Sequence, residues 1–429
     1  MEYQKKLKTF WAFNMISCSE ATSIIDKISL KLPEESISIL EALNRVTSED
    51  ILSPSKNPSA NNSAFDGFAV LAKETKGLTK LKTKKFKILK TIAAGDNPKL
   101  DNYEDYSTAE IMTGGLVPEQ FDSIIPVEKA NFFPSKEKPT HIIINEEVKQ
   151  YSYLRFAGED YNLKDIVLKK GEIVESKHIM TFTTLGIKEI KVKKSPKIIF
   201  FGTGNEIADY KETNLPVWKV RNSNNFYFTL FGESMHCHVV DGGVIKDNEP
   251  EKLKQSINDA INSDIDLFVT SGAISAGKFD FIPNLIKDFG FKTHFKGVNI
   301  KPGRPIMLSQ FRQKEKLFFG LPGNPISLAV GSRFFIYPLI RNSLGMSKEK
   351  QFRAKLTNEY NKIKNSTHFM RCFVTIDNKG ICNIEVLQDQ QSHRMKSFVK
   401  ANSWGIFEEG KEKFKSGDFV EWKPLIPGS

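Results

Sequence analysis

The feature that most constrains the fold of this chain is an alternation of apolar runs and amphipathic segments between residues 196 and 341. Short runs rich in β-branched and aromatic residues are typical of buried strands, and apolar residues three or four positions apart are typical of helices. Strands that alternate with helices predict an α/β domain with a doubly wound parallel sheet. The predicted strands are 198–201, 239–245, 265–269, 295–300, 306–311 and 317–321, and the predicted helices are 223–235, 249–263, a segment starting at 279, and 325–341.

One strand–loop–helix unit in this region has a polar, glycine-bearing loop. Residues 271–277 read SGAISAG and follow the apolar run 265–269. The N–H groups of such a loop, together with the N-terminus of the next helix, bind phosphate and other anions well. Many turns of α/β sheets, however, are glycine-rich only because a helix packs closely on the sheet. Taken alone, the loop leaves both interpretations open.

Polar loops follow the other predicted strands of this region as well. Because the carboxyl ends of parallel strands meet at one edge of a sheet, we expect these loops to form one site. Carboxylates there suit Mg²⁺, and cations and exposed N–H groups suit anions, which together predict a phosphoanhydride site. Any single position is more often structural than functional. The candidates are Thr203, Gly204, Glu206, Asp247, Ser271, Gly272, Ser275, Gly277, Asp280, Lys301, Arg304, Pro322, Gly323, Asn324 and Ser327.

Several common catalytic motifs are absent from the sequence. It contains no G-x-S-x-G elbow, no GxxxxGK[ST] phosphate loop and no GxGxxG dinucleotide fingerprint. No histidine stands near a suitable serine or cysteine nucleophile. The residues therefore favour metal-assisted handling of phosphate or another oxyanion over covalent or redox catalysis.

Composition indicates a globular protein of several domains. The chain has 429 residues, 40% hydrophobic and 26% charged, and about two to four domains are expected at this length. A formal net charge of +11 raises the question of a nucleic-acid partner. The lysines are scattered except at 80–90, where they alternate with apolar residues. That stretch fits either a basic patch or, better, a solvated strand edge protected against pairing.

The cysteines and the apolar segments indicate the cellular compartment of the protein. The four cysteines form no CxxC pair and no disulfide framework, which indicates a reducing compartment. His236, Cys237 and His238 resemble a metal cluster, but strand alternation would place the cysteine opposite the two histidines, so structural roles are favoured. No signal peptide opens the chain, and the apolar segment 317–340 is interrupted by prolines, glycine and an arginine. A cytoplasmic protein without a membrane span is predicted.

Smaller domains are expected around the α/β domain. Ser17 or Ser19 could cap a first short helix, and a second helix is predicted at 36–43. Short β-like runs between Gly, Pro and Asn turns follow, and alternating strands end the chain. The expected domains are an elongated linker domain of 15–60 and 152–194, a β-rich domain of 61–151, the α/β catalytic domain of 195–344 and a C-terminal β-domain of 345–429.

Eight stretches with distinctive turns are spread over residues 15–425. They are NNSAFDGFAV, IMTGGLVPEQFDSIIPVE, RFAGEDY, GTGNEI, RNSNNF, DLFVTSGAISAGKFDF, KPGRPIMLS and FGLPGNPISLAV. With them the sequence resembles the molybdopterin molybdenumtransferase family, which includes bacterial MoeA and the E domain of gephyrin. Loops like that at 271–277 also occur in molybdopterin adenylyltransferases. The SAFDG, MTG and GED turns ahead of it, with a β-domain behind, are specific to this family.

The resemblance implies a reaction and an assembly. Proteins of this family insert molybdate into adenylylated molybdopterin and cleave its phosphoanhydride, releasing molybdenum cofactor and AMP with the help of a divalent metal, usually Mg²⁺. The implied fold is an elongated subunit with a MogA-like α/β domain. The implied homodimer brings the β-rich domain of one subunit to the α/β domain of its partner. Contact with other proteins of molybdenum-cofactor synthesis is compatible with this role, whereas nucleic acid and membrane are not implied as partners.

The resemblance also implies residue roles. The residues that match catalytic positions are Asp66, Thr113, Asp160, Glu206, Asp247 and Asp280. Of these, the first three would reach across to the partner's site, and Asp247 and Asp280 would handle metal and phosphate. The residues that match pterin and phosphate positions are Thr203, Gly204, Ser271, Gly272, Ser275, Gly277, Pro322, Gly323 and Asn324. The residues that match molybdate positions are Lys301, Arg304, Ser327 and Arg371.

The sequence departs from the family pattern at several positions. Lys278 stands where an acid is frequent, and Asn61 stands where an aspartate frequently precedes NSA. Residues 366–371 keep the terminal F-x-R but lose the usual Gly-Arg before it. The serine expected near 392–397 has no unique position. These departures affect a metal-facing carboxylate and the molybdate ligands of the C-terminal domain.

Three other functions compete with this one. The α/β domain alone could transfer an adenylyl group to molybdopterin, but the intact SAFDG and MTG turns disfavour that. A dimer of this kind could hold a membrane-receptor tail as gephyrin does, but no receptor-linked partner domain is fused here. Binding of duplex nucleic acid is disfavoured by the scattered lysines.

Overall fold

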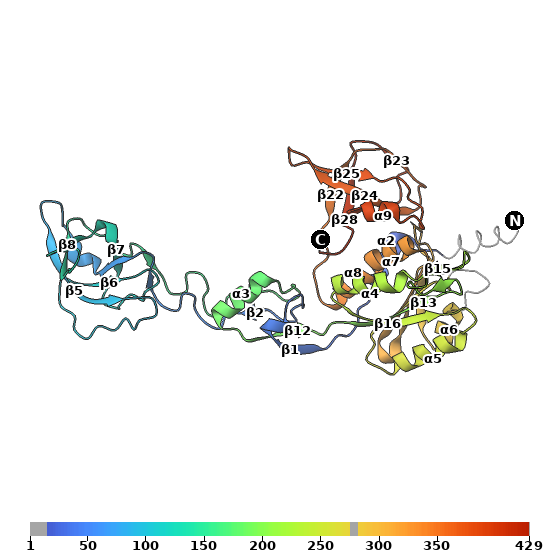
Figure 1. The fold of residues 1–429 in the computed structure, drawn as a ribbon, viewed down its shortest axis with the longest axis horizontal. Coiled ribbons are helices and arrows are strands. Elements are labelled where there is room, and N and C mark those ends of the chain that lie inside the picture. Colours follow the sequence, from blue (N-terminus) through green and yellow to red (C-terminus); the bar gives the residue numbers. More distant parts are fainter. Residues whose placement is uncertain (1–14, 275–281, 429) are drawn as a thin grey trace.

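The computed structural model describes residues 15–274 and 282–428, and these form an elongated, L-shaped chain. Figure 1 shows a β-rich part at one end, a narrow connecting part, and the α/β domain at the other end. The C-terminal β-domain stands on one side of the α/β domain. We call the β-rich end, which carries strands β4 to β9, the distal domain.

The connecting part contains two short antiparallel pairs and one helix. β1 (Glu34–Ser38) pairs with β12 (Glu189–Lys193), β2 (Ile51–Leu52) pairs with β11 (Ile166–Leu168), and α3 (Ser176–Leu185) packs beside them. The predicted helix at 36–43 is wrong. Serines alternate with isoleucines from 36 to 39, and this period of two lets the segment pair as a strand before one 3-10 turn (Ile39–Glu41).

The first helix in the described part of the chain, α2 (Cys18–Ile25), begins as predicted after a capping serine. The Ser17 hydroxyl accepts a hydrogen bond from the Glu20 N–H, and the Glu20 carboxylate accepts one from the Ser17 N–H. This reciprocal capping box satisfies two of the N–H groups that every helix leaves free at its start. Ser17, rather than Ser19, is therefore the cap.

The α/β domain is built on a six-stranded sheet in the order β16-β13-β17-β21-β20-β18. β16, β13, β17 and β21 are parallel, whereas β20 runs antiparallel to both of its neighbours. The predicted parallel arrangement does not extend to β20, because the turn between β20 and β21 makes a hairpin and is too short for a crossover. The strands are β13 (Lys197–Thr203), β16 (His238–Ile245), β17 (Leu267–Ser271), β18 (Lys292–Lys296), β20 (Met307–Phe311) and β21 (Lys316–Leu321).

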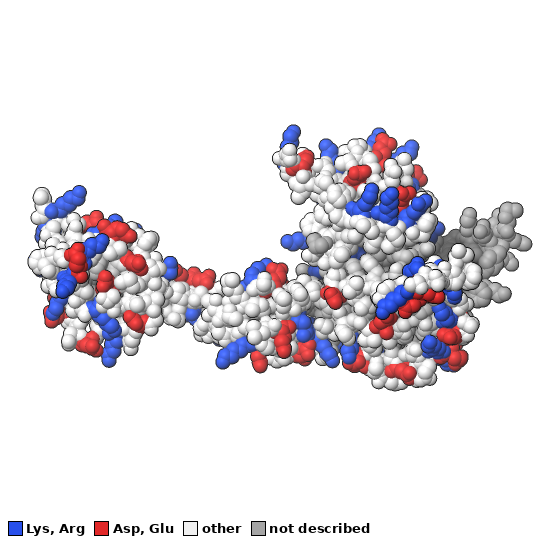
Figure 2. Space-filling model, in the orientation of Figure 1, with Lys and Arg blue, Asp and Glu red and all other residues white. Residues whose placement is uncertain are grey.

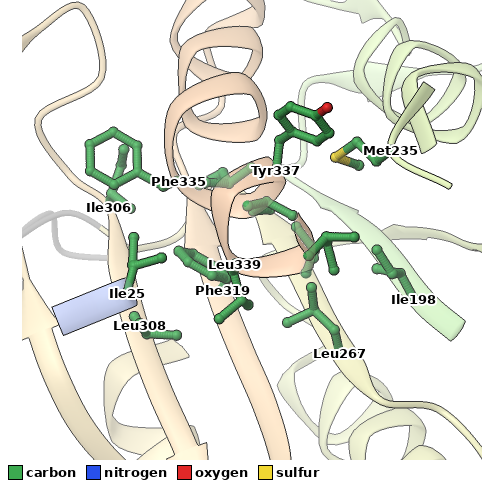
Figure 3. Packing of buried hydrophobic residues seen from close by; sticks show 14 of the residues in the cluster. Ile25, Ile198, Met235, Leu267, Ile306, Leu308, Phe319, Phe335, Tyr337 and Leu339 are labelled. Atoms are coloured by element: carbon green, nitrogen blue, oxygen red, sulfur yellow. The ribbon is translucent and has the colours of Figure 1, made fainter. Parts of the chain in front are cut away.

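Helices cover both faces of this sheet. One face meets α4 (Asn224–Ser234) and the helical segment 325–343, which consists of α7 (Pro325–Gly331), a π-turn (Ser332–Ile336) and α8 (Tyr337–Ser343). The other face meets α5 (Pro250–Ile261) and α6 (Ile282–Asp288). Strand alternation sends successive phenylalanines of β21 into the two opposite cores. Figure 3 shows Ile198, Leu267 and Phe319 of the first core beside Leu339 and Phe335 of the covering helix.

The distal domain contains a second six-stranded sheet, in the order β7-β4-β6-β5-β9-β8. The lysine-rich strand β5 lies between β6 and β9, so the prediction that residues 80–90 form a strand edge is wrong. Phe86 of this strand is buried while its lysines reach solvent, and this half-buried pattern also suits an inner strand. The strands are β4 (Gly67–Val70), β5 (Lys84–Ile92), β6 (Ser107–Ile111), β7 (Ser123–Pro126), β8 (Asn131–Phe133) and β9 (His141–Ile144).

The C-terminal domain is a closed five-stranded barrel. Its strands pair in the ring β24-β25-β22-β28-β26, which closes because β24 also pairs with β26. β19 (Ile300–Lys301), which lies just before β20 in sequence, pairs with β24 and so links the barrel to the α/β domain. The strands are β22 (Phe352–Leu356), β24 (Thr367–Ile376), β25 (Cys382–Val386), β26 (Ser403–Phe407) and β28 (Phe419–Pro424).

Surface charge is mixed over most of the molecule. Figure 2 shows acidic and basic side chains interspersed on the distal domain and the connecting part, and a row of basic side chains over α9 (Lys396–Lys400) of the barrel. The net charge of +11 is thus spread over several domains. Across 15–274 and 282–428, no helix is long and apolar enough to cross a membrane.

Candidate active site

The carboxyl ends of β13, β16, β17 and β21 lie together, and we call the turns that follow them the strand-end edge. Hydrogen bonds join neighbouring turns. The Thr203 hydroxyl donates to the Ser271 carbonyl oxygen (2.9 Å), and the Gly272 N–H donates to that of Leu321 (2.8 Å). The polar loops predicted to share one edge of the sheet are therefore brought together wherever the structure describes them.

Gly272 is required by close packing at this edge. Its φ of 98° lies in the left-handed region, and a Cβ there would be 2.6 Å from Thr203 Oγ1 and 2.8 Å from Thr203 O. Close packing, one of the two interpretations of the loop, thus holds for this glycine. Ser275 and Gly277 of the same loop lie outside the described residues.

Two carboxylates stand at the corner formed by β13 and β16. The Asn205 N–H donates to Asp247 Oδ2 (3.4 Å), and the Asp247 N–H donates to Asn205 Oδ1 (3.0 Å), so the two turns hold each other. The Glu206 carboxylate folds back so closely that a Cβ on Gly204 would be 2.5 Å from its Oε2. Asp280 and Lys278 lie outside the described residues. The described acidic positions of the edge are therefore adjacent.

These carboxylates can coordinate Mg²⁺ only together with oxygen atoms of the substrate. Mg²⁺ commonly uses one or two carboxylates together with waters and phosphates, and Asp247 and Glu206 can supply that number. In the described part of the chain, no three His, Cys, Asp or Glu side chains gather as a ligand set. His236, Cys237 and His238 are part of no such group.

The basic positions reach the same edge from the other side. Because β20 starts at this edge, the loop between β19 and β20 lies against α7, and a Cβ on Gly303 would be 3.3 Å from Ser327 O. Lys301 and Arg304 of this loop are exposed, whereas Ser327 is buried. Burial, with the nearby charges of Lys301, Lys362 and Arg304, lowers the pKa of His368 to about 4. This part of the edge is therefore strongly cationic beside a neutral histidine.

A second group of polar turns lies on the distal domain, and we call it the distal turn cluster. Asp66 Oδ1 accepts hydrogen bonds from the Thr113 N–H (2.6 Å) and from the Thr113 hydroxyl (2.8 Å). These two bonds lower the pKa of the Asp66 carboxyl. In the turn alongside, Asp160 Oδ2 accepts from the Asn57 side-chain amide (2.9 Å). Within one chain this cluster and the strand-end edge lie far apart, at opposite ends of the molecule (Figure 1).

Known proteins match nearly the whole chain. Family models match in order: the MoeA N-terminal region (domains I and II) at 16–186, a probable molybdopterin binding domain at 200–342, and the MoeA C-terminal region (domain IV) at 353–425. The molybdopterin molybdenumtransferase of Haemophilus influenzae is 31% identical over 416 residues, which are 96% of this chain and 99% of that protein. The chain belongs to the molybdopterin molybdenumtransferase family.

A further relative agrees with this membership, and solved structures share the fold. The molybdopterin molybdenumtransferase of Synechococcus elongatus is 25% identical over 413 residues, 96% of this chain and 100% of that protein. Two structures of the molybdopterin biosynthesis protein MoeA from Pyrococcus horikoshii superpose with TM-scores of 0.81 and 0.79 at 24% and 22% identity. Each covers 96% of this chain, and 99% and 100% of its own. The predicted fold class, a MogA-like α/β domain with β-rich domains, is confirmed.

One departure from the family pattern is explained by the structure. Asn61 Oδ1 accepts a hydrogen bond from the Ala157 N–H (2.9 Å), a bond that an aspartate oxygen would also accept. This contact ties the NSA turn to the GED turn of the distal turn cluster. Asn61 therefore keeps the acceptor that the fold needs, without the charge.

Arg371 holds a loop of the barrel beside the strand-end edge. Its buried guanidinium donates to the carbonyl oxygens of Asp389 (3.0 Å), Gln391 (3.2 Å) and Arg394 (2.6 Å). That loop touches the start of α7, where the Ile326 N–H donates to Ser392 O. Of the serines at 392–397, Ser392 thus lies beside α7, whereas the Ser397 hydroxyl donates a hydrogen bond to Asp389 O (2.9 Å) inside the barrel.

Asn224, at the start of α4, is a residue of this edge that the sequence analysis did not single out. Its side-chain amide donates to Gly323 O (2.8 Å) and to the Ser271 hydroxyl (3.3 Å), so it joins the turns after β21 and β17. Its Oδ1 is buried and has no hydrogen-bond partner among the residues that the structure describes. The only available signal was its place in the RNSNNF stretch, because nothing in helical periodicity marks a buried asparagine as a tie between loops.

Proposed function

We propose that this protein inserts molybdenum from molybdate into adenylylated molybdopterin and releases AMP and molybdenum cofactor. The observation that carries the proposal is the strand-end edge, where adjacent carboxylates and a cationic loop meet at the end of one sheet. Full-length membership of the molybdopterin molybdenumtransferase family supports the same reaction.

The acidic corner is suited to the phosphoanhydride. Asp247 and Glu206, with Asp280, would hold Mg²⁺, which when bound polarises phosphoryl oxygens and offsets their charge. The Asn205 N–H donates to Asp247 Oδ2 (3.4 Å) and the Asp247 N–H donates to Asn205 Oδ1 (3.0 Å), so the turn that carries Asp247 is ordered before substrate arrives and little binding energy is lost in ordering it. Thr203, Gly204, Ser271, Gly272, Ser275, Gly277, Pro322, Gly323 and Asn324 would line the pterin and phosphate path along the edge.

The basic side is suited to molybdate, a tetrahedral dianion. Lys301 and Arg304 are exposed beside Ser327 and attract an anion from solvent. Since the Arg371 guanidinium is occupied by carbonyl oxygens, its role in this proposal is to position the loop that carries Ser392. Molybdate and the phosphoanhydride would then be held at neighbouring parts of one edge.

The distal turn cluster would complete the site from a second subunit. Asp66, Thr113 and Asp160 lie far from the strand-end edge of their own chain, so they can serve it only across a homodimer. The elongated shape suits such an arrangement, because a two-fold axis would bring each distal domain to the partner's α/β domain.

A turnover assay with a matched control tests this function. Purified protein receives adenylylated molybdopterin, molybdate and Mg²⁺, and both AMP and pterin-bound molybdenum are measured. Asp247→Asn is expected to slow AMP release by about a hundredfold. Asp259→Asn, an exposed aspartate near the end of α5, should behave as the unchanged protein. Equal turnover in Asp247→Asn and Asp259→Asn, or no AMP from the unchanged protein, would contradict the proposal.

A further inference from the structure

Four aromatic side chains are exposed around the distal turn cluster. Phe65, Tyr151, Tyr153 and Phe156 are 48%, 53%, 41% and 40% exposed. They form two edge-to-face pairs: the Phe65 and Tyr153 ring centroids are 5.1 Å apart, and those of Tyr151 and Phe156 are 5.4 Å apart. Large apolar side chains grouped at the surface commonly mark a place where something binds.

The backbone under two of these rings is held in a costly conformation. Tyr151 has a φ of 67° and Tyr153 a φ of 57°, in the left-handed region that bulky residues rarely adopt. Hydrogen bonds maintain it: the Tyr151 N–H donates to the Ser123 hydroxyl (2.9 Å), and the Ala64 N–H donates to Tyr153 O (3.0 Å). Backbone strain of this kind clusters at ligand-binding sites. The rings are therefore held in place rather than free to collapse onto the domain.

A charged acceptor directly follows one of these rings in the sequence. Asp66 follows Phe65 in sequence, and its Oδ1 takes both bonds from Thr113. Its Oδ2 accepts no hydrogen bond from any residue that the structure describes, and the lowered pKa keeps the carboxylate charged. The surface thus combines exposed rings with one uncommitted anionic oxygen.

We propose that Phe65, Tyr151, Tyr153 and Phe156 form a stacking platform for the 2-amino-4-oxo pteridine ring of the substrate, with Asp66 Oδ2 accepting from the N–H edge of that ring. A planar heterocycle gains stacking energy on exposed aromatic rings. Its adjacent ring N–H and amino group suit a carboxylate, whereas adenine presents an amino group next to an acceptor nitrogen. The inference rests on the proposed function, because the platform would deliver the ring to the partner's strand-end edge.

The α/β domain offers one rival place for a flat ring. A cavity of about 510 Å³ beneath the turn after β13 is lined by Tyr210 and Phe226, whose ring centroids are 4.6 Å apart. The lysines that line it, Lys219 and Lys246, direct their ammonium groups at backbone carbonyl oxygens. Asp241, which also lines this cavity, accepts hydrogen bonds on Oδ1 from the Asn225 side-chain amide (2.6 Å) and from the Gly243 N–H (2.9 Å), so its carboxylate resembles that of Asp66. Neither aromatic ring of the cavity, however, stands on a left-handed backbone. The platform differs from the cavity in having four exposed rings, two of them on left-handed residues.

Pterin binding to the full-length protein tests the inference. The probe is 6-hydroxymethylpterin, followed by quenching of its own fluorescence, with AMP as the comparison ligand and light scattering as the measure of oligomeric state. Phe65→Ala and Tyr153→Asn are each expected to weaken pterin binding about tenfold and to leave AMP binding unchanged. Asparagine tolerates the left-handed backbone, so Tyr153→Asn removes the ring with little added strain. Tyr153→Phe, which keeps the ring, should bind like the unchanged protein.

Two further variants make the outcome decisive. Phe352→Ala removes an exposed ring that stacks on Trp422 in the barrel, and it should leave pterin binding unchanged. Tyr210→Ala removes a ring of the rival cavity, and loss of pterin binding there with normal binding in Phe65→Ala would overturn the proposal. Dissociation of the dimer by Phe65→Ala and Tyr153→Asn would assign the rings to subunit contact and would also overturn it. If the unchanged protein binds pterin on the platform but releases no AMP in the turnover assay, the proposed function fails and the platform stands.

Discussion

The strand-end edge and the distal turn cluster both gather polar residues, but they are built in different ways. At the strand-end edge, Thr203 and Ser271 are buried and their hydrogen bonds run between the ends of adjacent strands. In the distal turn cluster, Asp66 and Thr113 are exposed and bond to each other across a surface. The first site follows from the topology of a sheet, whereas the second depends on contacts between turns that no fold rule brings together.

Because of this difference, the strand-end edge and the distal turn cluster are suited to different roles. A buried, tightly packed edge can hold ligands at fixed positions, which suits phosphate and metal. In the proposed homodimer, the exposed cluster of one subunit would approach the strand-end edge of the other. Variants that disturb each cluster separately test this difference, and the expected effects range from loss of activity to a small shift in one titration.

The largest effect is expected when the two halves of the site are separated between chains. Asp66→Ala and Asp247→Ala should each lower AMP release by about a hundredfold or more. When the two variants are unfolded, mixed in equal amounts and refolded together, about a quarter of the activity should return. Half of the dimers then contain one copy of each variant, and each such dimer has one intact site of two. Mixing either variant with itself is the control. If the mixture stays as inactive as its components, the two clusters do not share a site across subunits.

A smaller effect is expected from two left-handed glycines. Gly272→Ala should lower the free energy of unfolding by about 3 kcal/mol, because it adds backbone strain and places a Cβ 2.6 Å from Thr203 Oγ1. Gly114→Ala in the distal turn cluster should cost only about 1 kcal/mol, because the nearest atom to its Cβ would be 3.8 Å away. Differential scanning calorimetry of the two variants measures the contrast. Equal losses would mean that the strand-end edge is no more tightly packed than the distal turn.

The same contrast decides how much could be predicted from the sequence. The strands and helices of the α/β domain followed from periodicity, and the edge where their loops meet followed from the sheet. The direction of β20 did not, because it depends on the short turn at 312–315 that closes a hairpin. The predicted helix at 36–43 failed because pairing with β12 prevailed over local helix propensity.

Sequence patterns alone could not predict the contacts between distant turns. Asp66 and Thr113 are 47 positions apart, and only the family resemblance marked them as a pair of interest. Arg371 matched a ligand position, yet its donors are directed at carbonyl oxygens of a loop whose course the sequence does not specify. Asn224 was missed for a similar reason, since its partners lie on two other turns.

A third prediction concerns the buried threonine of the strand-end edge. Thr203→Val keeps the shape of the side chain but removes the donor to Ser271 O, and it should lower the free energy of unfolding by about 1 kcal/mol. Thr203→Ser keeps the hydroxyl and should lose less from this bond, which makes it the matched control. Both are measured by thermal unfolding. A larger loss in Thr203→Ser than in Thr203→Val would show that the methyl group, and not the hydrogen bond, stabilises the edge.

The smallest effect is expected at the exposed threonine of the distal turn cluster. The Thr113 N–H and hydroxyl lower the pKa of Asp66 in the folded protein. At a pH above the ordinary aspartate pKa of about 3.9, this carboxylate therefore stabilises the fold. The stabilisation is lost as the pH falls through the lowered pKa. Thr113→Val removes the hydroxyl and keeps the N–H, so the pKa of Asp66 should rise part of the way, and the acid-induced loss below about pH 4 should shrink. A titration of ¹³C-labelled aspartate carboxyl groups follows Asp66 directly, with Thr113→Ser as the variant that keeps the hydroxyl. Should Asp66 titrate identically in Thr113→Val and Thr113→Ser, the hydroxyl bond does not hold the charge of this carboxylate, and the backbone N–H alone must account for it.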